Sequence, residues 1–154
     1  MKYALIGPAA LSVAAPAAAQ RSEANVVMSD HPGVRAAQEQ YGYADATIAG
    51  DLIFLSGIVA GTEPGETDLH AAYERAYAVI GRVLKRAGAS YDDIVDITSF
   101  HTDLIGQIDT MSQVHKKYVK GPYPTWTAID VDRLLPDNGI TEIKIIARKP
   151  AQPR

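Results

Sequence analysis

Hydrophobic and polar positions change their spacing several times along the chain, and each change predicts an element. From Tyr43 onward, short apolar segments alternate with turn residues, a pattern typical of β-strands. A glycine-containing turn at 49–51 predicts a hairpin. The predicted strands are 44–48 and 52–55, a short strand or bulge at 58–61, and longer strands at 94–101, 125–131 and 140–147.

Helical spacing separates these strands twice. Between Leu69 and Ala87, apolar residues recur at steps of three and four, which places them on one face of a helix. Thr67 is its predicted N-cap, and Gly88 is suited to the position after its last turn. A second helix is predicted at 108–119.

Strands joined through two long helices predict an α/β (α+β) domain, in which a mixed β-sheet carries two helices packed on one face. The other face of such a sheet needs a cover. A closed oligomer would supply it, and we therefore expect self-association.

The first 19 residues have the pattern of an export signal. Lys2 precedes an alanine-rich apolar run that ends in small residues at 17–19. The run is short for a membrane span and is interrupted by glycine and proline. We expect a signal peptide at 1–19, cleaved after Ala19, and a periplasmic protein without membrane attachment. The alternatives are an uncleaved anchor or a disordered tail.

The remaining chain divides into two parts. Residues 20–42 are mostly polar and lack a sustained apolar period, which predicts a flexible N-terminal lead-in. Residues 43–150 form the folded domain, and their number suffices for one core.

Composition excludes several classes of function. The net charge of −3, with no basic stripe, argues against a nucleic-acid partner. The absence of cysteine excludes disulfides and thiolate chemistry. The four histidines have no metal-ligand spacing, so we expect no metal and no cofactor. His70 and His115 are interpreted as helix surface, and His101 as a strand-end residue near a subunit contact or in solvent.

Two residues stand out as candidates for chemistry. Glu142 lies inside the apolar last strand, where alternation places it with Lys144 on the face opposite Ile143 and Ile145. The alternative is a solvent-facing ion pair of Glu142 with Lys144. Trp126 is the only tryptophan. It is a candidate site residue, and the alternative is that it anchors the core or an interface.

In this order and spacing, the segments resemble the Rid family, also called the YjgF family. The resemblance runs from about Tyr43 to Arg148. It implies a chorismate-mutase-like fold, a homotrimer, and hydrolysis of reactive enamines and imines to keto acids and ammonia. The matching residues are Tyr43, Ile53-Phe54-Leu55-Ser56-Gly57, Ala87-Gly88-Ala89-Ser90 with Tyr91-Asp92-Asp93-Ile94-Val95, Phe100 with Thr102-Asp103-Leu104, Tyr123-Pro124, and Glu142-Ile143 leading to Ile146-Ala147.

The same resemblance implies a small-molecule pocket between neighbouring subunits. It assigns Glu142 the role of positioning or activating the attacking water, which requires a carboxylate able to accept a proton. The positions it implies for substrate binding are Tyr43, Ser56, Gly57, Phe100, Trp126 and Ala128.

One departure affects the expected substrate. The deaminases of the family carry an arginine that clamps the substrate carboxylate, and here that position is Trp126, which cannot form such a fork. We therefore expect an exported Rid-like protein that hydrolyses an imine or enamine C=N bond with diverged specificity. The alternative is a trimer that binds a small ligand without turnover. An endoribonuclease is disfavoured by the acidic charge.

Overall fold

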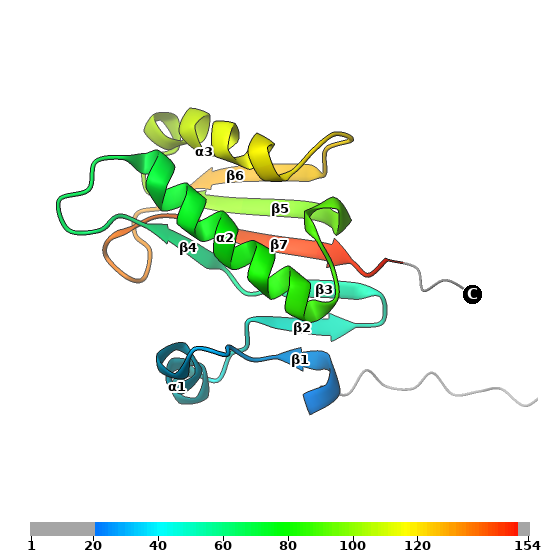
Figure 1. The fold of residues 1–154 in the computed structure, drawn as a ribbon. Helices are drawn as coiled ribbons and strands as arrows, with labels where there is room; N and C mark the ends of the chain where they lie inside the picture. Colours follow the sequence, from blue (N-terminus) through cyan, green and yellow to red (C-terminus); the bar gives the residue numbers. More distant parts are fainter. Residues whose placement is uncertain (1–20, 151–154) are drawn as a thin grey trace, which may run out of the picture.

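The computed structural model describes residues 21–150, and these form a seven-stranded mixed sheet with helices on one face. Helix α2 (Leu69–Ala87) lies across the strands and α3 (Leu104–Tyr118) lies beside it on the same face (Figure 1). The predicted architecture is confirmed. The other elements are η1 (Glu23–Asn25), β1 (Val26–Val27), α1 (Pro32–Tyr41), β2 (Ala46–Ala49), β3 (Leu52–Leu55), β4 (Ile58–Gly61), η2 (Tyr91–Asp93), β5 (Ile94–His101), β6 (Thr125–Asp130) and β7 (Gly139–Arg148).

Strand β7 organises the sheet. The strand order is β1-β2-β3-β7-β5-β6, and all pairs are antiparallel except β5 with β6. Strands β3 and β4 both pair with β7, one after the other: Phe54 lies opposite Ile146, and Val59 lies opposite Glu142. The break between them falls at Ser56-Gly57. This topology brings the break next to the middle of β7.

The first long helix forms as its sequence predicts, except at its start. Asp68, and not Thr67, is the N-cap, because the Asp68 carboxylate accepts a hydrogen bond from the His70 backbone N–H at 2.9 Å. At the other end, Gly88 adopts φ = 81°, a left-handed conformation that glycine adopts without strain.

Local interactions shift two other predicted features. Helix α3 begins at Leu104 rather than at 108, because the Asp103 carboxylate caps it by accepting a hydrogen bond from the Gly106 N–H at 3.2 Å. In β5, Val95 is exposed although simple alternation places it beside buried Ile97, because the register of β5 against β7 shifts between Ile94 and Asp96.

The segment predicted to be a flexible lead-in is structured over most of its length. Strand β1 pairs with β2, and α1 is a regular helix with Pro32 in its first turn. Gln38 of α1 is buried, and its amide accepts a hydrogen bond from the Ser29 N–H at 2.8 Å and donates one to Asp45 at 2.6 Å. Polar groups rather than an apolar stripe hold this segment, which is why hydrophobic periodicity missed it.

The structure does not test the prediction made for the N-terminus. The predicted signal peptide at 1–19 lies outside the described residues. Within residues 21–150, no helix is both long and apolar enough to cross a membrane.

A polar cluster lies inside the core between the sheet and the helices. His101 is completely buried, with Nε2 2.8 Å from Ser99 Oγ and Nδ1 3.1 Å from Thr141 Oγ1. The Tyr73 hydroxyl reaches the same Thr141 oxygen at 2.7 Å. The interpretation of His101 as a solvated or interfacial residue is therefore wrong, because the alternation of β5 directs its ring toward the helices.

His115 is also buried, contrary to its interpretation as helix surface. Its Nδ1 lies 2.9 Å from the Tyr77 hydroxyl, so α3 turns this histidine toward α2. Burial lowers the pKa of His101 and of His115 below the ordinary value of 6.5.

The two buried histidines are expected to make the folded protein less stable in acid. Their pKa is lower in the folded protein, so the unfolded chain binds more protons below pH 6.5, and stability is lost as the pH falls from there toward the folded pKa. Urea unfolding at pH 7.5 and 5.5 should show a lower free energy of unfolding at pH 5.5. Each histidine contributes at most about 1.4 kcal/mol per pH unit.

The control is His31→Gln, which changes an exposed histidine and should keep the dependence. His101→Gln should weaken it. Equal free energies of unfolding at the two pH values would contradict the prediction.

Candidate functional site

Glu142 lies on the face of the sheet opposite α2 and α3. Its neighbours on β7, Thr141 and Ile143, are completely buried toward the helices, so alternation directs Glu142 the other way. Phe100 of β5 is its cross-strand partner and therefore shares its face. No described helix lies across this face (Figure 1). The carboxylate is half-buried and has an aromatic neighbour.

Gly57 is required by the position of the Glu142 side chain. A Cβ atom on residue 57 would lie 1.7 Å from Glu142 Oε1 and 2.7 Å from its Cγ, so only glycine leaves room. The carboxylate rests on the Gly57 backbone, at the break between β3 and β4. Gly57 thus positions Glu142 by the absence of a side chain.

The Glu142 carboxylate is free to act as a proton acceptor. Among residues 21–150 it takes part in no hydrogen bond or ion pair, and the ion pair with Lys144 considered as the alternative is not formed. A carboxylate held in place without a partner can accept a proton from water or bind a ligand donor.

Ser56 and Tyr43 lie at the start of this region. The Ser56 hydroxyl donates to the Ala44 carbonyl oxygen at 2.6 Å, so its proton is committed to the backbone. The Ser56 N–H donates to the Asp45 carbonyl oxygen at 2.9 Å. Tyr43 is partly exposed, and its N–H donates to the Gln38 carbonyl oxygen. Ser56 therefore anchors the segment that carries Tyr43.

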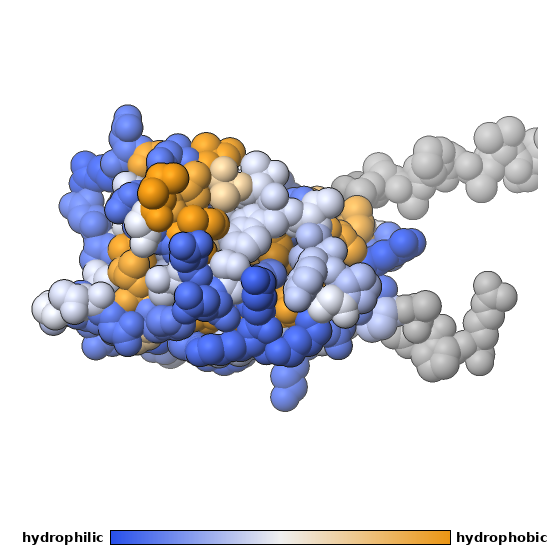
Figure 2. All heavy atoms as spheres, turned by 90° about the horizontal axis from the view of Figure 1, so that it is seen from above, coloured by the Kyte–Doolittle hydropathy of each residue, from blue (hydrophilic) through white to orange (hydrophobic). Residues whose placement is uncertain are grey.

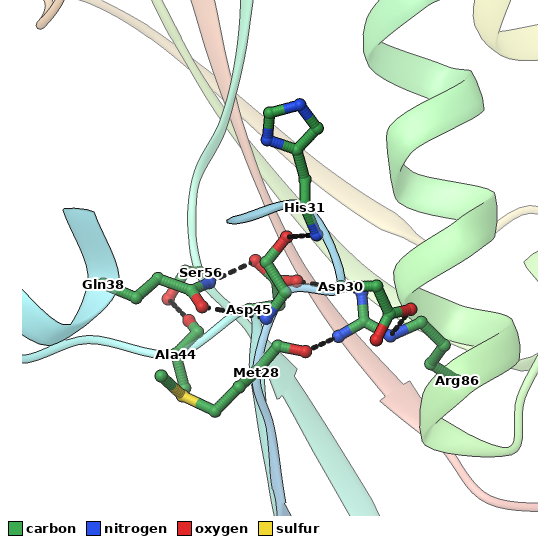
Figure 3. Close-up of polar contacts among 9 residues, drawn as sticks. Met28, Asp30, His31, Gln38, Ala44, Asp45, Ser56 and Arg86 are labelled. Carbon is green, nitrogen blue, oxygen red and sulfur yellow. Dashed lines mark hydrogen bonds and ion pairs between the residues drawn. The ribbon is translucent and has the colours of Figure 1, made fainter. Parts of the chain in front are cut away.

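A polar network holds that segment between α1 and α2 (Figure 3). Asp45 accepts hydrogen bonds from Gln38 of α1 and, at 3.0 Å, from Arg86 of α2. Arg86 also donates to the Met28 carbonyl oxygen and pairs with Asp30 at 3.2 Å. These residues could not be found from the sequence, because no short motif joins positions so far apart in the chain.

A cavity opens beside Tyr43 and Ser56. Its volume is about 470 Å³, within the range of small-molecule sites. Phe54 and Lys144 line it together with those two residues, on the face of the sheet that carries Glu142. The rest of its lining is Arg21, Val26, Met28, Gln38, Glu39, Gly42, Ala44, Thr47 and Leu55.

Trp126 points to the opposite face. Its indole N–H donates to Ser99 Oγ at 2.9 Å, and its ring centroid lies 5.0 Å from that of His115 on α3. The side chain packs against the core. Within one chain, the contacts of Trp126 are therefore those of a core anchor and not those of a site residue.

The predicted site residues therefore divide into groups. Gly57, Phe100 and Glu142 lie together, and Tyr43 and Ser56 line the adjoining cavity. Trp126 faces the helices, and Ala128, two residues along β6, shares its face. One chain does not bring these two residues to Glu142. Over the described residues, no group of three or more histidine, cysteine, aspartate or glutamate side chains is placed to hold a metal ion.

Comparison with known proteins identifies the chain's relatives. The family model described as endoribonuclease L-PSP matches residues 34–149. The RutC family protein YjgH of Escherichia coli is 40% identical over 116 residues, which cover 73% of this chain and 87% of that protein. A bovine 2-iminobutanoate/2-iminopropanoate deaminase is 32% identical over 110 residues, covering 68% of this chain and 78% of the deaminase.

Solved structures agree with this assignment. The structure of a protein called YjgH superimposes with a TM-score of 0.69 at 34% identity, covering 83% of this chain and 97% of the other. A YjgF-family protein from Neisseria meningitidis gives a TM-score of 0.63 at 32% identity, with 72% and 90% covered. The chain belongs to the YjgF/RidA family.

Proposed function

We propose that this protein hydrolyses the C=N bond of a small imine, supplied as such or formed from its enamine tautomer, with Glu142 as the residue that accepts a proton from water. The observation that carries the proposal is the partner-free Glu142 carboxylate, seated on Gly57 beside a cavity of small-molecule size. Relatives named as 2-iminobutanoate/2-iminopropanoate deaminases support this reaction type.

The proposed reaction needs one proton acceptor from the protein, and Glu142 supplies it. An enamine tautomerises to the imine, whose carbon is attacked by the oxygen of water while the water proton passes to Glu142. The amine nitrogen is then protonated, the carbon–nitrogen bond breaks, and ammonia leaves as the carbonyl forms. One imine and one water thus give one carbonyl compound and one ammonia.

The residue that recognises the substrate differs from that of the arginine-bearing deaminases. Trp126 provides no cation, and its indole N–H already has an acceptor inside the same chain. Recognition of the substrate must therefore rest on residues other than Trp126.

The second candidate is a protein that binds a small ligand without turnover. Two contacts favour binding without turnover. The Ser56 hydroxyl already donates to the Ala44 carbonyl oxygen, and the Trp126 indole faces the helices, so neither side chain offers a group to a reacting substrate. The same cavity serves both functions, so turnover separates them. The net charge of −3 opposes binding to a polyanion and so disfavours the endoribonuclease activity that the description of the family model names.

Ammonia release is the deciding measurement. Imino acids made by an amino-acid oxidase, and uncharged imines made by a flavin amine oxidase, are supplied to the purified protein. We expect accelerated release of ammonia that disappears in Glu142→Ala, with circular dichroism confirming that the variant is folded. A folded wild-type protein that accelerates neither reaction would favour the binding protein.

We also propose that the site is completed by a neighbouring copy in a homotrimer. Glu142 and Phe100 lie on a sheet face that no described helix covers, and Phe54 is exposed on the same face. Figure 2, seen from above, shows hydrophobic side chains exposed among polar ones. In α3, β6 and the loop after β6, the large exposed ones are Ile105, Ile129 and Leu135. A monomeric mass by light scattering would contradict this assembly.

Export is the remaining part of the proposal, and it rests on the sequence of residues 1–19. After expression in a bacterium, we expect the protein in the periplasmic fraction with Gln20 at its N-terminus. Intact-mass spectrometry of that fraction measures the cleavage point. A protein retained in the cytoplasm with residues 1–19 attached would contradict export.

A further inference from the structure

The cavity beside Tyr43 carries an excess of positive charge. Lys144 and Arg21 line it, and in the described part of the chain neither forms an ion pair. Glu39 is the one acidic residue of the lining, and it is paired with Arg35 at 3.2 Å. Two cations thus face a cavity whose acid is already neutralised, which favours an anionic occupant.

Lys144 stands in a fixed relation to Glu142. Both lie on β7, two residues apart and on the same face of the sheet, so their Cα atoms are separated by about 7 Å. The cavity reaches Ser56, and Gly57, the next residue, supports the Glu142 carboxylate. A molecule of about that length, bound to Lys144 at one end, can therefore reach Glu142 with the other.

The remaining walls suit an apolar group. Phe54 and Tyr43 expose 38% and 43% of their surface, and both border the cavity. Aromatic faces of this kind pack against a hydrocarbon substituent. The lining thus combines a positively charged side chain, Lys144, with the apolar surfaces of Phe54 and Tyr43.

We propose that Lys144 determines specificity by binding the carboxylate of the C=N substrate. The positive charge that pairs with this carboxylate is then supplied by strand β7. The occupant is a small carboxylate with an apolar substituent. Arg21 adds positive charge to the lining. The inference rests on the proposed hydrolysis at Glu142 and names the chemical class of its substrate.

Steady-state kinetics with a matched pair of imines tests the assignment. One imine carries a carboxylate, and the other carries the corresponding neutral amide. We expect the wild-type protein to prefer the carboxylate, and Lys144→Gln to raise its KM about tenfold or more while leaving kcat unchanged. The amide should be unaffected. Lys85→Gln removes an exposed lysine on α2 and should change neither substrate.

Two kinetic outcomes would overturn the assignment. If Lys144→Gln leaves the preference for the carboxylate unchanged, the cation is not used in recognition. If it impairs both substrates equally, Lys144 has only a structural role. Restoration of the wild-type KM in Lys144→Arg would support recognition of charge.

A binding experiment keeps this inference separate from the proposed reaction. Isothermal titration calorimetry compares benzoate with benzamide, and it needs no turnover. Benzoate binding that is lost in Lys144→Gln but kept in Glu142→Gln supports the assignment even if no imine is hydrolysed. Equal binding of benzoate and benzamide, or no benzoate binding to the wild-type protein, overturns it even if hydrolysis is found.

Discussion

Replacing Gly57 by alanine is expected to lower kcat for imine hydrolysis by about 100-fold or more while the protein remains folded. The added Cβ would occupy the space of Glu142 Oε1 and Cγ, so the carboxylate must swing away from the Gly57 backbone. Within one chain no described helix covers this sheet face, so the displaced side chain has room to move and the fold can accommodate it. Ammonia release and circular dichroism, measured on the same sample, separate the two effects.

Two further variants make this prediction specific. In Gly33→Ala, the new Cβ would have no neighbour closer than 3.4 Å, so activity and stability should stay at wild-type values. In a Glu142→Ala background the clash is absent, and Gly57→Ala should then cost little stability. Full activity in Gly57→Ala would show that the contact between Gly57 and Glu142 is irrelevant to catalysis.

Replacing Trp126 by alanine is expected to lower the free energy of unfolding by about 2–4 kcal/mol. The indole fills the space between β6 and His115 of α3, and its N–H donates to Ser99 inside the polar cluster. Trp126→Phe keeps most of the ring and loses the hydrogen bond, so about 1 kcal/mol should be lost. Urea unfolding at pH 7.5 measures both values.

The matched control for Trp126 is Tyr123→Ala. Tyr123 is an aromatic residue close in sequence but 64% exposed, and its removal should change stability by less than about 0.5 kcal/mol. A Trp126→Ala variant as stable as this control would show that the indole does not anchor α3. Trp126→Arg should not restore a carboxylate clamp, because position 126 faces the helices.

Apolar periodicity predicted the elements that it governs. Residues 69–87 form a helix because their buried stripe packs on the sheet, and Ile143 and Ile145 are buried on one face of β7 as expected. Periodicity failed where polar groups decide the structure. Asp103 lengthens α3 by a cap, and Gln38 fastens α1 by buried hydrogen bonds.

The candidate site was predictable only in part. Glu142 could be singled out because a carboxylate inside an apolar strand requires an explanation, and the structure places it beside Phe100 and Gly57. The direction of Trp126 could not be read from β6, whose residues on both faces include polar ones. The cavity at Lys144 depends on the pairing of distant segments, which no local pattern records.

Among the described residues, strands β1, β4 and β6 are each paired on one side only, and they offer different surfaces to another chain. One edge ends in β1, which has only two residues, and such a short strand gives a foreign strand little to pair with. Strand β4 has four residues and pairs only with β7. Strand β6, at the other end of the sheet, is longer: it has six residues and pairs only with β5. Strand-to-strand aggregation is therefore expected to start at β6, and any assembly that covers this strand would also improve the solubility of the protein.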